Sequence, residues 1–271
     1  PVGSLGMQRA DGEILAAQAA EGFGVPFTLS TMSICSIEEV ARNTSKPFWF
    51  QLYVMRDHDF AKRLVERAKA VQCSALVLTL DLQILGQRHA DIRNGLSIPL
   101  KIKLSNLFDL LSKPSWCYQM ARTKNRTFGN VMGHVKDITN LNSLTKWVQD
   151  QFDTRLNWDD VKRIKDWWGG KLIIKGIMDP DDAKMAQKCG ADALVVSNHG
   201  GRQLDGVNSS ISMLPEIKKA VSNIDVLMDG GISSGQDILK AIAMGAEGVM
   251  VGRSFVYGLS AGGKEAVTKS L

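Results

Sequence analysis

Residues 190–206 read GADALVVSNHGGRQLDG, and this stretch holds both a clear strand signal and a group of reactive side chains. Residues 193–196 are apolar throughout, which predicts a β-strand buried on both faces. His199 and Arg202 follow it, with two glycines between them. An imidazole transfers protons near neutral pH, and a guanidinium binds a carboxylate through two parallel hydrogen bonds. The stretch favours a site for an acidic substrate, although a lone His and Arg would also suit an ordinary polar loop.

The rest of the chain repeats the pattern of a buried strand followed by a helix. The passage GAEGVMV at 245–251 echoes GADALVV at 190–196, as expected of a fold built from successive strand–helix units. Strands that are apolar throughout and alternate with amphipathic helices predict a parallel sheet covered on both faces. The predicted strands are residues 26–30, 48–54, 75–81, 171–176, 193–199, 225–230 and 248–253.

The helices between these strands have recognisable starts. Ser36 and Glu39 have the spacing of a capping box. Asp179 and Asn157 each stand before acidic residues that complement the helix dipole, so both predict a helix start. Residues 57–70 have the apolar spacing of a packed helix.

Composition limits the class of protein. A chain of 271 residues with 44% hydrophobic content suits one large α/β barrel or two small domains. No apolar run approaches the roughly 18 residues of a membrane span, and the first residues lack the pattern of a signal peptide. The cysteines are far apart and show no metal-binding spacing, which predicts reduced thiols in a cytoplasmic protein and no metal site. They are Cys35, Cys73, Cys117 and Cys189.

Residues 96–156 interrupt the alternation of strands and helices, because they form a connection far longer than the usual few residues. Within it, residues 97–134 carry six Lys or Arg residues and one acid, so their net charge of +5 equals that of the whole chain. A basic, apolar excursion suits the surface of an anionic membrane or an acidic partner, and a solvated loop explains it equally well. No nucleic-acid partner is expected, because no aromatic-interleaved basic stripe accompanies the charge.

Polar side chains occur at the C-terminal ends of all seven predicted strands. The working residues of α/β barrels lie at this end. Any one of them could be a satisfied polar group of the core, but the repetition favours a site. The residues are Ser30, Gln51, Tyr53, Thr79, Asp81, Lys175, His199, Asp229 and Arg253.

Physical roles can be assigned to several of these side chains. Lys175 would stabilise negative charge on a reduced, electron-accepting ring, or would be an ion-paired lysine of the core. Residues 229–231 and Arg253 offer a carboxylate for sugar hydroxyls and a clamp for a phosphate, although 229–231 could be a simple turn. Asp81 could hold His199 in its productive tautomer.

The string SNHGGRQLDG at 197–206 resembles the signature of the FMN-dependent α-hydroxy acid dehydrogenases and oxidases. The likeness extends over essentially all 271 residues, and several segments are most similar to the bacterial respiratory L-lactate dehydrogenases of that family. The resemblance implies a (β/α)8 TIM barrel formed by residues 1–271 as a single FMN-binding domain, with the excursion at about 96–156. In this chain the first barrel strand and the last helix are expected to be missing or truncated.

The resemblance also implies roles for individual residues. The catalytic residues would be His199, Asp81, Tyr53 and Lys175, and the substrate would be bound by Arg202, Tyr53 and Arg88. The residues implied to hold FMN are Val2, Gly3, Ser30, Gln51, Thr79, Lys175, Asp229, Gly230, Gly231, Gly252 and Arg253. Two positions depart from the family pattern: Ser233 replaces an arginine that many relatives carry, and Met32 replaces a larger aromatic residue.

The reaction implied is the oxidation of a small L-2-hydroxy acid, foremost L-lactate, to the 2-oxo acid. Electrons would pass to a quinone or cytochrome, with residues 97–134 touching the inner face of the cell membrane. One alternative is a soluble oxidase that produces hydrogen peroxide. Another is a catalytically silent flavin-binding barrel or an inactive fragment. Relatives of this kind are often tetramers, so a homo-oligomer is expected.

Overall fold

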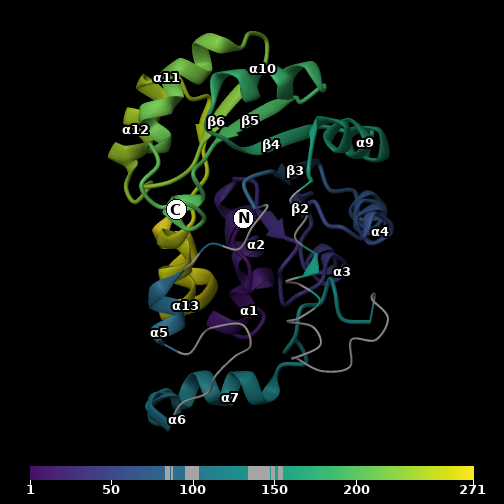
Figure 1. Cartoon of the computed structure of the whole chain (residues 1–271). Coiled ribbons are helices and arrows are strands. Elements are labelled where there is room, and N and C mark those ends of the chain that lie inside the picture. Colours follow the sequence, from purple (N-terminus) through teal and green to yellow (C-terminus); the bar gives the residue numbers. More distant parts are fainter. Residues whose placement is uncertain (83–85, 87, 95–103, 134–146, 148–149, 152–154) are drawn as a thin grey trace.

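The computed structural model describes residues 1–82, 86, 88–94, 104–133, 147, 150–151 and 155–271 (Figure 1). Seven parallel strands form one sheet in which neighbours follow the order of the chain. The strands are β1 (Thr28–Ser30), β2 (Trp49–Tyr53), β3 (Ala75–Thr79), β4 (Leu172–Ile177), β5 (Ala193–Val196), β6 (Asp225–Met228) and β7 (Gly248–Val249). Each lies within a strand predicted from the sequence or extends one residue beyond it, so the expectation of a parallel α/β sheet is confirmed.

The sheet curls into an open arc. Within the described residues β1 pairs only with β2, and β7 pairs only with β6. Seven parallel strands in chain order, as the described residues form them, are the arrangement expected of most of a (β/α)8 barrel. The carboxyl ends of all seven strands therefore meet along one edge of the arc.

Several helices cover the outer face of the sheet, and helices also connect its strands. They are α1 (Leu5–Gln8), α2 (Gly12–Phe23), α3 (Ile37–Arg42), α4 (His58–Ala70), α5 (His89–Arg93), α6 (Leu104–Leu111), α7 (Pro114–Arg122), α9 (Trp158–Trp168), α10 (Pro180–Lys188), α11 (Ser210–Ala220), α12 (Gly235–Ala243) and α13 (Arg253–Ser270), with the short 3₁₀ turn η1 (His199–Gly201). The predicted starts are confirmed. Ser36 with Glu39, and Asn157 with its N3 acid, form capping boxes, and the side chains of Asp57 and Asp179 accept first-turn N–H groups.

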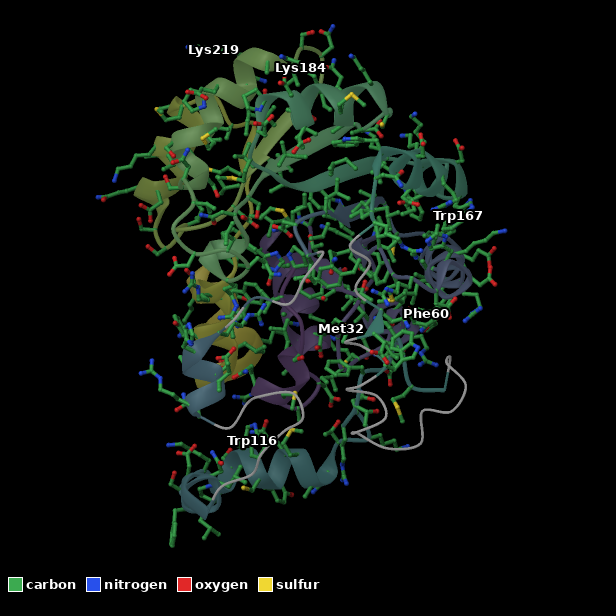
Figure 2. All side chains as sticks on the ribbon, viewed as in Figure 1. Met32, Phe60, Trp116, Trp167, Lys184 and Lys219 are labelled. Atoms are coloured by element: carbon green, nitrogen blue, oxygen red, sulfur yellow. The ribbon has the colours of Figure 1, made fainter. Side chains whose placement is uncertain are left out.

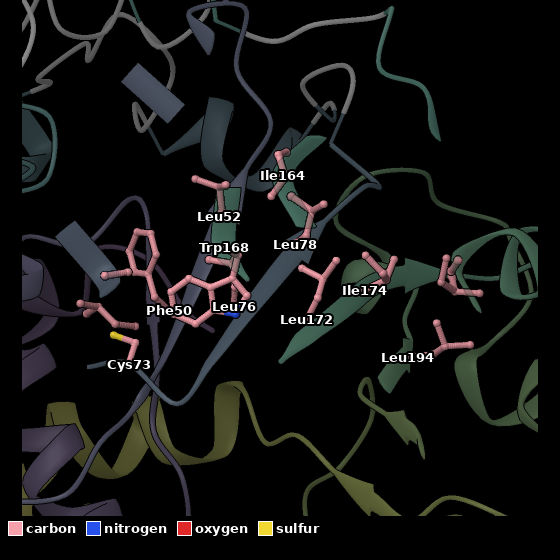
Figure 3. Close-up of a cluster of buried hydrophobic side chains, with 14 of the residues drawn as sticks. Phe50, Leu52, Cys73, Leu76, Leu78, Ile164, Trp168, Leu172, Ile174 and Leu194 are labelled. Atoms are coloured by element: carbon pink, nitrogen blue, oxygen red, sulfur yellow. The ribbon is translucent and has the colours of Figure 1, made fainter. Parts of the chain in front are cut away.

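Each face of the sheet is buried in an apolar core, so the strands carry apolar side chains on both faces. Val77 and Val195 belong to a small cluster built mainly from strand side chains inside the curl. Leu76, the residue before Val77, and Leu172, its partner on β4, belong to the other core, which also contains Trp168 of α9 (Figure 3). The two-residue period of a strand sends alternate side chains to these two cores.

The excursion of residues 96–156 carries two described helices, α6 and α7, which project away from the sheet (Figure 1). The Trp116 Nε1–H of α7 donates to the Met7 carbonyl at 3.0 Å, and Asn125 Nδ2 donates to Asp11 Oδ1 at 2.9 Å. Residues 95–103 and 134, which belong to the predicted basic segment or border it, lie outside the described residues. In the part of the chain that is described, no helix has the length and apolar character needed to cross a membrane.

Candidate functional site

A buried cation and anion lie together at the carboxyl edge of the sheet. Lys175 of β4 is only 3% exposed, and its Nζ lies 2.9 Å from Asp229 Oδ2 and donates to Ser197 Oγ at 2.7 Å. Burial alone would raise the pKa of the Asp229 carboxyl, but the adjacent Lys175 ammonium and Ser197 hydroxyl hold that pKa below its usual value. Lys175 is thus an ion-paired lysine, and it is also placed where the strand ends bring reactive groups together.

The imidazole of His199 is fixed by a carboxylate from another strand. His199 Nδ1 lies 2.9 Å from Asp81 Oδ1, and the His199 backbone N–H donates to Ser197 Oγ at 3.2 Å. His199 itself has a left-handed backbone (φ 57°), and the left-handed glycines at 200–201 follow it. Gly176 (φ 100°) lets Asp81 approach, because a Cβ there would lie 2.8 Å from Asp81 Cβ. A strained turn and a close backbone approach hold this pair in place.

Two guanidinium groups and a phenol lie next to this pair. Burial and the neighbouring Asp81 carboxylate raise the pKa of the Tyr53 phenol above its usual value. Burial and the nearby Arg202 guanidinium lower the pKa of Arg88. Arg202 Nη2 lies 3.3 Å from Asp91 Oδ2, and the two side chains are 44% and 35% exposed. Arg202 therefore lies at the rim of the site, close enough to Arg88 for the two positive charges to affect each other.

The predicted residues of β1, β2 and β3 form a chain of buried hydrogen bonds. Ser30 Oγ donates to Gln51 Oε1 at 3.2 Å, and Gln51 Nε2 donates to Thr79 Oγ1 at 3.1 Å. Gly3 lies against this chain, since a Cβ there would be 3.6 Å from Ser30 Oγ and 3.0 Å from the Met32 carbonyl. Met32, labelled in Figure 2, also borders a small apolar cavity of about 40 Å³.

A larger cavity, of about 390 Å³, opens beside the ends of β5 and β6. Gly230 (φ 93°) and Gly231 (φ 76°) line it with left-handed backbone that a side chain would strain. Arg253 lines it too, and its Nη2 donates to the Gly200 carbonyl at 3.4 Å. We refer to this space as the Arg253 cavity.

The remaining predicted cofactor residues lie at the margin of the site. Gly252 is the residue before α13 and so directly precedes Arg253. Val2 packs against the second apolar core, which includes Leu5 of α1 and Leu259 of α13. The residue before Val2, Pro1, is close enough to Lys175 and Asp229 for their charges to act on its amino group. The predicted residues therefore gather around the carboxyl edge, but only some of them touch one another.

Unpartnered polar atoms show that this edge fits a polar ligand. Among the described residues, four buried side-chain atoms have no hydrogen-bond partner; Asp229 Oδ1, Asp81 Oδ2 and Arg88 Nε lie here, and the fourth is Arg163 Nε in α9. Buried polar atoms are seldom left unpaired in native proteins. With the Ser30–Gln51–Thr79 chain on one side and the Arg253 cavity on the other, the residues present fit a flat polar ring with a phosphate tail. No group of three or more metal-ligating side chains occurs in the described part of the chain.

Two residues of the site were not singled out from the sequence. Ser197 is fully buried and accepts hydrogen bonds from both Lys175 and the His199 backbone. Its position directly after the apolar run of β5 was an available signal, because the same position marked the other site residues. Lys240 lines the Arg253 cavity from α12, and no local pattern distinguishes it from other helical lysines.

A curled sheet of parallel strands with its reactive side chains at the carboxyl edge defines an α/β-barrel enzyme. The family model described as FMN-dependent dehydrogenase matches residues 1–271. The chain is 46% identical over 273 residues to an L-lactate dehydrogenase of Haemophilus influenzae (strain PittEE), covering 100% of this chain and 71% of that protein. It is 44% identical to an L-lactate dehydrogenase of Vibrio cholerae serotype O1 (strain M66-2), covering 72% of that protein.

Solved structures agree with the sequence relatives. A crystal structure of the monotopic membrane protein (S)-mandelate dehydrogenase superimposes with a TM-score of 0.93 at 34% identity, covering 100% of this chain and 71% of that one. A mandelate oxidase superimposes with a TM-score of 0.80 at 35% identity, covering 99% of this chain and 68% of that one. The chain belongs to the FMN-dependent dehydrogenase family, and the protein is an FMN-dependent oxidoreductase of barrel fold.

Proposed function

We propose that this protein oxidises a small L-2-hydroxy acid, foremost L-lactate, to the corresponding 2-oxo acid, which is pyruvate for lactate. The names of the relatives at 46% and 44% identity support lactate as the substrate. The observation that carries the proposal is the His199–Asp81 contact of 2.9 Å beside two guanidinium groups. A proton acceptor next to carboxylate-binding cations suits the chemistry of a hydroxy acid.

In this proposal FMN, when bound, accepts the two electrons that leave the substrate. It would be held by the Ser30–Gln51–Thr79 chain, by Lys175 and Asp229, and by the phosphate-binding residues of the Arg253 cavity. The full set is Val2, Gly3, Ser30, Gln51, Thr79, Lys175, Asp229, Gly230, Gly231, Gly252 and Arg253. The Lys175 ammonium would stabilise negative charge on the reduced ring.

His199 would remove a proton from the substrate through Nε2. Nδ1 is engaged with Asp81, so Nε2 is the nitrogen left to face a ligand. The proton removed is either that of the α-carbon or that of the hydroxyl, and both routes need the same base. The Asp81 carboxylate would orient the ring and stabilise the imidazolium that forms.

Arg202 and Arg88 would bind the substrate carboxylate, with Tyr53 as a hydrogen-bond donor. The contact of Arg202 with Asp91 is half exposed, and exposed ion pairs contribute little to stability. A substrate carboxylate can therefore replace Asp91 at small cost. The raised pKa of Tyr53 keeps its phenol protonated at neutral pH, as a donor must be.

For the electron acceptor we propose a quinone or cytochrome at the inner face of the cell membrane. The exposed Phe108 and Leu111 of α6 and Tyr118 of α7, together with the basic charge of residues 97–134, support a peripheral membrane contact. A structural relative described as a monotopic membrane protein supports it as well. A homo-oligomer, foremost a tetramer, is part of the same proposal.

An oxidase that reduces oxygen to hydrogen peroxide is the second candidate, favoured by the similarity to mandelate oxidase. Oxygen consumption and reduction of a quinone analogue, measured with the same purified protein and L-lactate, separate the two. Faster reduction of the quinone analogue supports the dehydrogenase, and stoichiometric peroxide supports the oxidase.

The role of His199 is tested by anaerobic spectroscopy. We expect L-lactate to bleach the absorbance of bound FMN in the parent protein, and His199→Gln to keep the bound-flavin spectrum but abolish the bleaching. His58→Gln, at the start of α4, is the matched control and should be reduced like the parent. Bleaching of His199→Gln at the parental rate would refute the role, and a parent protein that no 2-hydroxy acid reduces would indicate a silent flavin protein.

A further inference from the structure

The walls of the Arg253 cavity carry more positive than negative side chains. Two cations line the cavity, Arg253 at the start of α13 and Lys240 in α12, together with one carboxylate, Asp237. Without Lys240 the cavity walls would carry no net positive charge. The balance of charge in this cavity therefore depends on one lysine.

Asp237 is an ionised carboxylate that cannot itself bind an anion. Its Oδ2 accepts the Ser233 and Ser234 backbone N–H groups at 3.1 and 3.0 Å and their hydroxyls at 3.0 and 2.9 Å. These hydrogen bonds lower the pKa of the Asp237 carboxyl, so it is negative at neutral pH. Because the hydroxyl groups of Ser233 and Ser234 both donate to Asp237, neither hydrogen is directed at a ligand in the cavity.

Lys240 is exposed, and within the described residues it forms no ion pair. The other cations of the site lie outside the lining of this cavity: Lys175 contacts Asp229 at 2.9 Å, Arg202 contacts Asp91 at 3.3 Å, and Arg88 donates to Gln203 Oε1 at 3.1 Å. Arg253 makes one long hydrogen bond of 3.4 Å to a carbonyl. Lys240 and Arg253 are thus the two cations that line the Arg253 cavity, and within the described residues neither is paired with a carboxylate.

We propose that Lys240 binds the phosphate group of FMN together with Arg253. A phosphate monoester carries a charge of about −1.5 to −2 at pH 7, which one cation offset by a carboxylate does not neutralise. The left-handed backbone at Gly230 and Gly231 keeps that wall of the cavity free of side chains, so the phosphate can approach. The inference rests on the FMN binding of the proposed function and assigns to it a residue of this chain.

Comparison of FMN with riboflavin, which lacks the phosphate, tests the proposal. We expect Lys240→Gln apoprotein to bind FMN about tenfold or more weakly than the parent, by quenching of flavin fluorescence at low salt. Its affinity for riboflavin should stay within about twofold of the parent. Lys240→Arg should restore most of the FMN affinity, because it restores the charge.

Lys219→Gln is the matched control, since Lys219 is an exposed lysine of α11 outside the Arg253 cavity (Figure 2). It should leave both affinities unchanged. Unchanged FMN affinity in Lys240→Gln would overturn the proposal, and so would an equal loss for FMN and riboflavin. The test needs no hydroxy acid, so failure of the lactate assay and failure of this proposal are separate results.

Discussion

At the residue scale, the acid–base pair is the feature from which the proposed chemistry follows. His199 depends on a left-handed turn for its position and on Asp81 for the orientation of its ring. The two residues are 118 positions apart in the chain. A change of either one should thus alter proton transfer without altering the sheet that carries them.

We predict that Asp81→Asn lowers the rate of FMN reduction by L-lactate by roughly 10²–10⁴-fold in anaerobic stopped-flow measurements. The amide carries no charge to stabilise the imidazolium and can favour the wrong tautomer. Asp91→Asn makes the same chemical change at the exposed rim and should alter the rate by less than about threefold. If both variants reacted alike, Asp81 would have no special role.

At the scale of elements, one buried asparagine joins the end of the excursion to the edge of the sheet. Asn130 is fully buried, and its Nδ2 donates to Ser33 Oγ at 2.9 Å and to the Thr31 carbonyl at 3.3 Å. Its Oδ1 accepts the Ile37 N–H, at the start of α3, at 3.0 Å. Asn130 thus holds the loop that follows β1 and carries Met32 into the site.

We predict that Asn130→Ala lowers the free energy of unfolding by about 2–4 kcal/mol in urea titrations, because several buried donors and acceptors lose their partner. Asn43→Ala, at an exposed asparagine after α3, should cost less than about 1 kcal/mol. Equal stability of the two variants would show that the Asn130 contacts carry no net energy.

At the scale of the whole molecule, carboxylates with lowered pKa values make stability depend on pH. Hydrogen bonds from the Arg67 guanidinium lower the pKa of Glu38 to about 2, and Lys175 helps to hold that of Asp229 below its usual value. A group whose pKa is lower when folded contributes stability above its unfolded pKa and loses it as the pH falls through the folded value. These groups stabilise the fold at neutral pH and not in acid.

We predict that the free energy of unfolding stays nearly constant from about pH 7 to 5 and then falls below about pH 4.5. Glu38→Gln should show a shallower fall between about pH 4.5 and 2, since it removes one of the titrating groups. Urea titrations at a series of pH values measure both curves. Parallel curves for parent and variant would mean that the Glu38–Arg67 contact does not contribute to acid unfolding.

The sequence by itself determined the parallel sheet and the edge at which the site lies. Apolar runs, capping residues such as Ser36 and Asp179, and polar residues at strand ends are local signals, and a strand or helix start depends mainly on local neighbours. The stretch that contains His199 and Arg202 was recognised in the same way. Ser197 directly follows the same apolar run, so its position indicated a site residue in the same way, but the sequence assigned it no role.

Only the tertiary structure decided which of these side chains meet. The sequence suggested Asp81 as a partner of His199 from the chemistry of the two residue types, and the tertiary structure brings their side chains to 2.9 Å while it sets Arg202 at the rim with Asp91. Lys240 reaches the Arg253 cavity because α12 packs against β7, a relation that no local pattern encodes. Such contacts depend on how far the curl of the sheet brings separate strand ends together, and this distance is a property of the packed molecule.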